Sequence, residues 1–121
     1  MKCRGIRGAT TVDENRDSAI LDATQTLLEA IVSANAIAVE DVASVIFSVT
    51  PDLDAVAPAA AARRMGWVHA PLFCVQEMAV PGSLPRCIRV LVHWNTEQTP
   101  SQIHHIYLRE ARRLRPDLVE Q

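Results

Sequence analysis

The chain has 121 residues, 49% of them hydrophobic and 21% charged, a balance typical of a globular protein with a single core. Its formal net charge is −2, and its basic residues are eleven arginines and one lysine, Lys2. Without a basic excess there is no general field to hold nucleic acid or an anionic membrane, so a bound anion must be held locally. The excess of arginine has two explanations: genomic composition, or guanidinium groups that form paired hydrogen bonds with carboxylates.

Neither hydropathy nor cysteine content indicates secretion or membrane insertion. No stretch approaches the roughly 20 apolar residues of a membrane span, and residues 1–7 begin with charges rather than an apolar signal core. Cys3, Cys74 and Cys87 are odd in number and lack C-x-x-C spacing, which favours reduced thiols over disulfides or a zinc site. We therefore expect a cytoplasmic protein, with one domain over residues 1–121.

The first third of the chain predicts a strand followed by a long helix. Residues 2–12 are typical of a strand, made irregular by its two glycines. Apolar residues then recur at helical spacing over residues 17–34. Asn15 or Asp17 can cap the start of this helix, and Asn35 stands where a left-handed C-terminal cap is tolerated.

The middle of the chain predicts a buried strand and a short helix. Residues 42–49 are rich in β-branched and aromatic side chains, and proline in the following Thr50-Pro51-Asp52 stops the strand. Pro58 suits the first turn of a helix over residues 59–65, which Gly66 ends.

Two more strands are predicted at residues 71–76 and 87–95, joined by a proline- and glycine-containing loop over residues 78–86. Residues 103–113 fit either a helix or a strand, and propensity does not decide between them. These elements predict an α/β or α+β fold with a mixed sheet and one main covering helix. Because one helix cannot cover both faces of such a sheet, association with other copies is expected.

Three charged residues stand in or beside predicted strands: Arg7 in the first strand, Glu77 at the end of the third and Arg89 within the fourth. An unpaired charge buried in a sheet costs several kcal/mol, so each needs a partner, a ligand or solvent. Strand alternation could turn both arginines to solvent, or Glu77 could pair with one of them. The alternative is that the three charges face a ligand.

Other site patterns are weak. The four histidines have no metal-ligand spacing, so no metal is expected. Ser48 lacks the G-x-S-x-G context of a nucleophile and is interpreted as a residue that packs or pairs with the backbone. Residues 5–8 match the short G-x-x-G loop of KH nucleic-acid modules, but they fall inside a strand rather than between helices, and no nucleic-acid partner is expected.

A series of longer motifs runs in order along nearly the whole chain. They are Arg4-Gly5-Ile6-Arg7-Gly8-Ala9-Thr10-Thr11-Val12, Thr50-Pro51-Asp52-Leu53, Gln76-Glu77-Met78, Cys87-Ile88-Arg89-Val90, Tyr107-Leu108 and Leu114-Arg115-Pro116-Asp117-Leu118. Together they closely resemble the small monofunctional chorismate mutases of the AroH type. The resemblance implies a homotrimer with a pseudo-α/β-barrel core, in which each subunit has a mixed five-stranded sheet and one long helix. It also implies active sites at the subunit interfaces and a strand around Tyr107.

The reaction of that family is the rearrangement of chorismate to prephenate, in the branch of the shikimate pathway that leads to phenylalanine and tyrosine. One C–O bond breaks as one C–C bond forms within a single molecule, and the family uses no cofactor. The enzyme must hold the folded conformer of a dicarboxylate and stabilise the charge that develops at the ether oxygen. Arginine suits both tasks because it stays charged and presents several donors in one plane.

The resemblance assigns the catalytic roles. Arg89 matches the cation that contacts the breaking ether oxygen and the side-chain carboxylate. Glu77 and Cys74 match groups placed on the ring hydroxyl and ring, and Arg7 and Tyr107 match groups that bind the enolpyruvyl carboxylate.

Three further positions match the substrate-binding residues of the family. Arg63 matches an arginine that reaches from the neighbouring subunit toward the ring carboxylate, although a solvated cation at a helix end remains the alternative. Leu114 and Arg115 lie in the C-terminal segment that closes over the site, and the few residues after Leu118 leave only a short tail as a lid.

The sequence departs from the family at the pocket rim. Better-known members have a bulky aromatic residue and a lysine where this chain has Ala57 and Ala60, and this chain lacks one residue between Arg64 and Gly66. We expect a more open rim and weaker substrate binding, with the chemistry retained. Two rivals remain: the trimeric enamine/imine deaminases, which bind a substrate carboxylate by an arginine at a subunit cleft, and a dicarboxylate-binding module that has lost activity.

Overall fold

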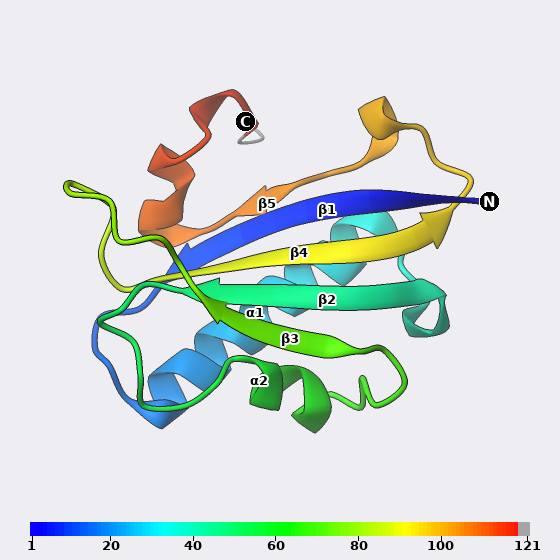
Figure 1. The fold of residues 1–121 in the computed structure, drawn as a ribbon. Helices are drawn as coiled ribbons and strands as arrows, with labels where there is room; N and C mark the ends of the chain where they lie inside the picture. Colours follow the sequence, from blue (N-terminus) through cyan, green and yellow to red (C-terminus); the bar gives the residue numbers. More distant parts are fainter. Residues whose placement is uncertain (119–121) are drawn as a thin grey trace.

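A computed structural model describes residues 1–118, and the tail expected to contribute to a lid, residues 119–121, lies outside them. Five strands and two α-helices make up most of the described chain (Figure 1). No helix in residues 1–118 is long and apolar enough to cross a membrane. The strands are β1 (Lys2–Thr11), β2 (Val42–Val49), β3 (Leu72–Gln76), β4 (Cys87–Thr96) and β5 (Ile106–Tyr107); the α-helices are α1 (Asp17–Asn35) and α2 (Ala59–Arg64). Short 3-10 helices are η1 (Val39–Asp41), η2 (Pro100–Gln102), η3 (Arg109–Arg113) and η4 (Pro116–Leu118).

The strands form one mixed sheet in the order β3-β2-β4-β1-β5. The central strand β4 is antiparallel to both β1 and β2, while the outer strands β3 and β5 are parallel to β2 and β1. This arrangement confirms the predicted mixed five-stranded sheet with one long helix.

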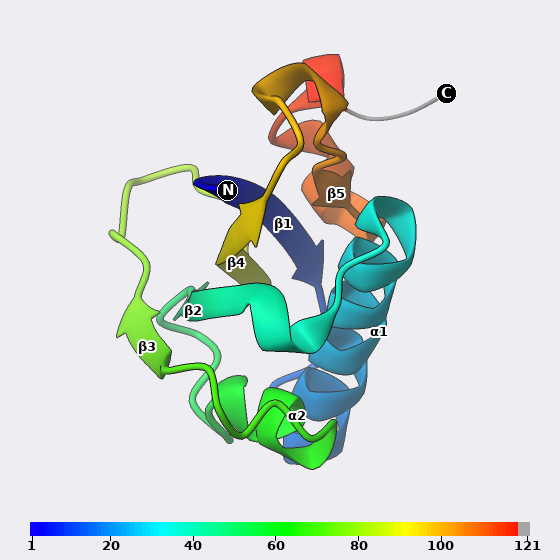
Figure 2. The same ribbon diagram turned by 90° about the vertical axis from the view of Figure 1, so that its right-hand side faces the viewer.

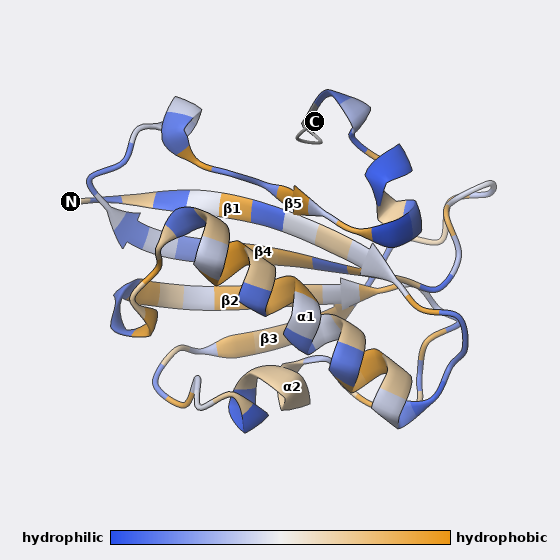
Figure 3. Cartoon of the chain, turned by 180° about the vertical axis from the view of Figure 1, so that it is seen from behind, coloured by the Kyte–Doolittle hydropathy of each residue, from blue (hydrophilic) through white to orange (hydrophobic). Residues whose placement is uncertain are grey.

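Helix α1 crosses one face of the sheet, and α2 packs beside it near β3 (Figures 2 and 3). The apolar stripe of α1, which includes Leu27, Leu28 and Ile31, is fully buried against Ile6 of β1 and its neighbours. Burial of each such side chain contributes about 1.5–3 kcal/mol, which explains why the helical periodicity predicts this element so well.

Gly8 lets α1 approach β1 closely. A Cβ atom at Gly8 would lie 2.8 Å from Cδ1 of Ile31 and 3.0 Å from Cγ1 of Val90. The pairing of β1 with β4 is continuous from Lys2 to Thr11. The expectation that glycine makes this strand irregular is therefore wrong: Gly8 serves helix packing, because a strand residue without a side chain leaves room for the helix.

Of the predicted caps of α1, Asp17 accepts a free N–H of the first turn, from Ser18 at 2.7 Å, whereas those at Asn15 and Asn35 are wrong. Arg16 occupies the N-cap position without a side-chain cap bond, and Asn15 instead accepts the backbone N–H groups of Asp54 and Ala55. At the other end Ala36 adopts the left-handed conformation, with φ of 52°. The side chain of Asn35 is thereby free to bond the backbone of His104, which ties the helix to the C-terminal segment.

The ambiguous region 103–113 contains both a strand and a helical turn. β5 is only two residues long, and the N–H of Leu108 donates to the carbonyl of Ala9 at its end. Arg109 then takes a left-handed conformation, with φ of 55°, which ends the strand, and η3 follows. The strand around Tyr107 is confirmed, although it is much shorter than the segment.

The second face of the sheet is not covered by α1 or α2. Residues of β4 alternate between buried and partly exposed, with Val90 and Val92 on the helix side and Arg89 and Leu91 on the other. We call this second surface the open face. Two rows of paired residues cross it: Val75, Ser48, Arg89, Ala9 and Tyr107, and beside them Phe73, Ile46, Leu91 and Arg7.

Candidate active site

A pocket of about 310 Å³ lies on the open face, above the middle of the sheet. The register places Arg89 directly opposite Ser48 on one side and Ala9 on the other, and Ala9 opposite Tyr107. Residues far apart in sequence therefore meet at one place because four strands bring them into register. The pocket is lined by Arg7, Gly8, Ala9, Ile46, Ser48, Arg89, Val90, Leu91 and Tyr107.

Arg89 is the only residue in the described chain with a buried side-chain polar atom that lacks a hydrogen-bond partner, and that atom is Nε. The nearest carboxylate oxygen, Oε1 of Glu77, lies 3.6 Å from Nε, which is an ion pair but too long for a hydrogen bond. The Arg89 side chain is 43% exposed, so its outer part is open to the pocket. An unsatisfied buried donor beside an accessible cation is arranged to receive an oxygen from a ligand.

The Thr50-Pro51-Asp52 motif fixes the start of the strand that carries Arg89. The Asp52 carboxylate accepts the backbone N–H of Arg86 at 2.9 and 3.2 Å, and Thr50 Oγ1 accepts the N–H of Cys87 at 3.0 Å. Arg86 is held in a left-handed conformation, with φ of 48°. These bonds end the preceding loop and set where β4 begins, two residues before Arg89.

Cys87 is packed against the base of Arg89. Burial raises the pKa of the Cys87 thiol, and the nearby Arg89 guanidinium partly opposes this effect. The thiol is buried with Ala9 and Ala111 in a small apolar cluster, to which Tyr107 and Leu114 add their side chains. Cys87 is thus a neutral packing group beneath the arginine rather than an activated nucleophile.

Arg7 and Tyr107 stand at the β1–β5 side of the same pocket. The backbone N–H of Arg7 donates to Nδ1 of His105 at 2.9 Å, which extends the β1–β5 pairing to the residue before the first residue of β5. Burial lowers the pKa of His105, and the positive charges of Arg7, Arg115 and His104 lower it further.

Arg115 makes a two-pronged contact with Asp117, at 3.1 and 2.9 Å. This hydrogen bonding lowers the pKa of Asp117 and raises that of Arg115. The charge of Arg7 also acts on the pKa of Asp117, and Tyr107 acts on that of Arg115. Arg115 therefore lies close to the Arg7 and Tyr107 side of the pocket, but its guanidinium is bonded to Asp117 of the same chain.

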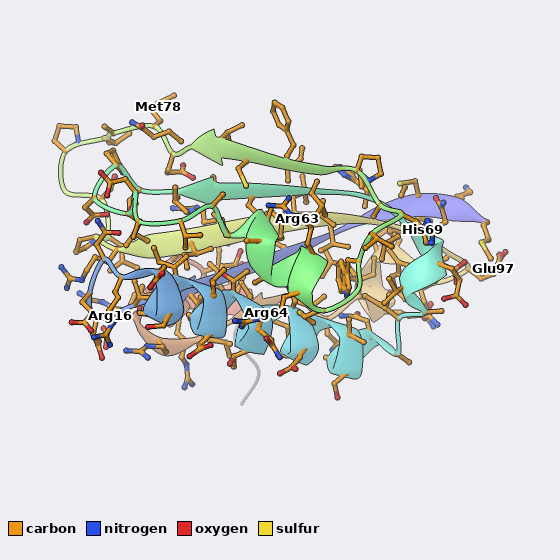
Figure 4. The ribbon with its side chains drawn as sticks, turned by 90° about the horizontal axis from the view of Figure 1, so that it is seen from below. Arg16, Arg63, Arg64, His69, Met78 and Glu97 are labelled. Carbon is orange, nitrogen blue, oxygen red and sulfur yellow. The ribbon has the colours of Figure 1, made fainter. Side chains whose placement is uncertain are left out.

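Cys74 and Arg63 do not join this pocket. Cys74 pairs with Phe47, a buried core residue, and so lies on the helix side of β3, where it lines a separate pocket of about 290 Å³ together with Ala57. Arg63 and Arg64 leave α2 in different directions (Figure 4). Both arginines are exposed, and Arg64 bonds Gln25 of α1. Within one chain, then, Cys74 does not line the pocket of Arg89.

The chemistry available in the pocket is anion binding by fixed cations. Arg7 and Arg89 line the pocket, and among residues 1–118 no carboxylate makes a direct hydrogen bond with either guanidinium, while Tyr107 supplies a hydroxyl. Within residues 1–118, no three His, Cys, Asp or Glu side chains are grouped as a metal site would need.

Comparisons with known proteins show the family of the chain. Residues 3–118 match the family described as chorismate mutase type I. The chain belongs to the chorismate mutase type I family. It is 53% identical to the chorismate mutase AroH of Thermus thermophilus over 116 residues, 95% of each chain. It is 48% identical to the chorismate mutase AroH of Bacillus subtilis (strain 168) over 119 residues, 98% of this chain and 94% of the relative.

A solved structure supports the same assignment. A chorismate mutase from Clostridium thermocellum aligns with a TM-score of 0.89 and 48% identity, covering 90% of this chain and 97% of that one. Membership of the chorismate mutase type I family and the mixed five-stranded fold are thus both confirmed.

Sequence reasoning overlooked Ser48 at the site. The sequence predicts that Ser48 packs or pairs with the backbone, whereas in the structure it lines the pocket and its hydroxyl donates to Oε1 of Glu77 at 2.7 Å. The available signal was a polar residue in an otherwise apolar strand, next to the Thr50-Pro51-Asp52 motif of the family.

Proposed function

We propose that the chain is a chorismate mutase, an isomerase that converts chorismate to prephenate in the synthesis of phenylalanine and tyrosine. The observation that carries the proposal is Arg89, which lines a pocket of about 310 Å³ and whose buried Nε lacks a hydrogen-bond partner among residues 1–118. The proposal treats residues 1–121 as one catalytic domain, active in the cytoplasm and without cofactor or metal.

The reaction needs binding and electrostatics rather than a nucleophile. The bond between a ring carbon and the ether oxygen breaks as a C–C bond forms between the ring and the enolpyruvyl methylene, and the oxygen stays on the side chain as a ketone. No atom leaves the substrate, and no electrons are exchanged with the protein. In this proposal Arg89 donates to the ether oxygen as negative charge grows there, which is worth about 3–4 kcal/mol for one well-placed donor. Arg7 and Tyr107 bind a substrate carboxylate and hold the folded conformer.

Glu77 accepts the ring hydroxyl in this proposal. Its Oε1 is already bonded to Ser48, which leaves Oε2 for the substrate. Leu114 and Arg115 close the C-terminal side of the pocket, where Arg115 can exchange its contact with Asp117 for the substrate.

We further propose that the enzyme is a homotrimer with its sites at the subunit interfaces. The open face and the edge strand β3 carry exposed apolar side chains, among them Phe73 at 64% and Val75 at 39% exposure, which favours burial against another copy. Cys74 and Arg63 are separate from Arg89 within one chain. A site built between two subunits would use Arg89 and Glu77 of one and Arg63 and Cys74 of its neighbour.

The deaminase alternative is not favoured by the family and relatives found. A binding module without turnover remains the alternative outcome, motivated by the small residues Ala57 and Ala60 at the proposed rim. The test is to incubate the protein with chorismate and follow its ultraviolet absorbance, with prephenate identified as product. Prephenate formation supports the proposal. Tight calorimetric binding of a dicarboxylate without turnover would instead identify a binding module.

A further inference from the structure

Ser48 stands at the centre of the candidate site without an assigned role. It lies on β2, half-buried, between Val75 of β3 and Arg89 of β4 in the register of the open face. Its hydroxyl donates to Oε1 of Glu77 at 2.7 Å. Within residues 1–118 this is the only side-chain hydrogen bond that the Glu77 carboxylate accepts.

The Glu77 side chain would otherwise have considerable freedom. Glu77 follows the last residue of β3, and its backbone is fixed by one bond from its N–H to the carbonyl of Val49, at 2.8 Å. Its carboxylate is 29% exposed, and its distance of 3.6 Å from Nε of Arg89 is too long for a directional bond. The short bond from Ser48 is therefore what selects one carboxylate position beside Arg89.

We infer that Ser48 is a positioning residue, which orients the Glu77 carboxylate so that one oxygen faces Arg89 and the other stays available to a substrate hydroxyl. This inference rests on the proposed function, because it assigns the free oxygen to the substrate. A hydrogen bond to an ionised acceptor is stronger and more directional than a neutral one, which suits this task. The bond from Ser48 also keeps Oε1 of Glu77 from forming a hydrogen bond with Nε of Arg89, so that this donor remains for the ligand.

The experiment measures kcat and KM for chorismate in Ser48→Ala, Ser48→Cys and Ser48→Thr. Loss of one bond to a charged group predicts that kcat/KM falls about tenfold or more in Ser48→Ala. Ser48→Thr keeps the hydroxyl and retains most of the activity, and Ser48→Cys, a weaker donor, lies between them. This order remains measurable even if one variant folds poorly.

Ser44→Ala is the matched control. Ser44 is half-buried on the same strand, and its hydroxyl bonds Nδ1 of His93 at 2.9 Å, away from the pocket. Ser44→Ala should keep the wild-type kcat/KM, while its melting temperature changes by a small amount, similar to the change in Ser48→Ala.

A double-mutant cycle separates positioning from a general structural effect. In a Glu77→Gln background, Ser48→Ala should change kcat/KM less than about twofold, because the oriented carboxylate is already gone. Equal activity of Ser48→Ala and wild type, or fully independent effects of the two substitutions, would overturn the inference. If wild type itself forms no prephenate, the proposed function fails instead.

Discussion

The backbone N–H of Arg7 donates to Nδ1 of His105, so that one histidine side chain extends the pairing of β1 with the C-terminal segment. The bond requires an unprotonated Nδ1. Three positive groups lie near the ring: Arg7 on β1, Arg115 at the end of the chain and the adjacent His104. Together with burial, they oppose the protonation of His105 in the folded protein, at a point next to the candidate site.

His105 should make the folded protein less stable in mild acid. Its pKa is lowered by folding, so the unfolded chain takes up the proton first as the pH falls through about 6.5. Its contribution is thus complete above that pH and is lost as the pH falls toward the lower pKa of the folded state. His105→Asn keeps an acceptor that does not titrate. The free energy of unfolding of this variant should therefore change less with pH than that of wild type between about pH 7.5 and 5.5. Urea titrations check this; parallel curves for the two proteins would refute it.

Gly8→Ala should destabilise the protein by about 1–3 kcal/mol, because the new methyl group meets Val90 and Ile31 and must displace one of them. Gly5→Ala is the matched control on the same strand, since its Cβ would lie at an ordinary 3.4 Å from Leu91. Urea unfolding measures both. Equal stability of the two variants would mean that the packing of α1 on β1 is not tight at Gly8.

The interface proposal predicts complementation between two inactive variants. Arg63→Ala and Arg89→Ala should each form trimers, at three times the chain mass of 13.3 kDa by gel filtration, with little activity. When the two are unfolded together and refolded as a mixture, about a quarter of the sites should contain both native arginines. Activity should recover to that level. If the mixture is no more active than its components, then either both arginines of a site come from the same subunit or Arg63 is not part of the site.

Residues typical of the family should strengthen substrate binding when they are introduced at the rim of the pocket. Ala57→Phe combined with Ala60→Lys should lower KM for chorismate about fivefold with kcat nearly unchanged, because the added groups bind substrate and transition state alike. Ala43→Lys adds the same charge at an exposed position near the start of β2 and serves as the control. A changed kcat with constant KM would contradict this account of the rim.

The elements that could be predicted from the sequence are those with strong local patterns. The apolar stripe of α1 and the alternation of buried and partly exposed residues in β4 both follow from burial of one side of the element. Such patterns can be recognised in the sequence of the element alone. The C-terminal cap of α1 was not predictable because Asn35 has a better partner in His104, 69 residues away, and Ala36 adopts the left-handed conformation in its place. Local propensity cannot register such a distant partner.

The site was only partly predictable for a similar reason. Glu77 and Arg89 could be singled out as charges in apolar surroundings, but their approach depends on how β2 joins β3 to β4. Ser48 offered a weaker signal because serine in a strand usually needs no special explanation.

The most direct test of the central claim is the rate at which wild type and Arg89→Ala convert chorismate to prephenate. Arg89→Ala should lose about 2–4 kcal/mol of transition-state stabilisation, or roughly a hundredfold in kcat, and Arg89→Lys should be nearly as poor because a point charge replaces a fork of donors. Arg16→Ala, which removes an exposed arginine before α1, should keep the wild-type rate. If Arg89→Ala forms prephenate as fast as wild type, the assigned role of Arg89 is wrong.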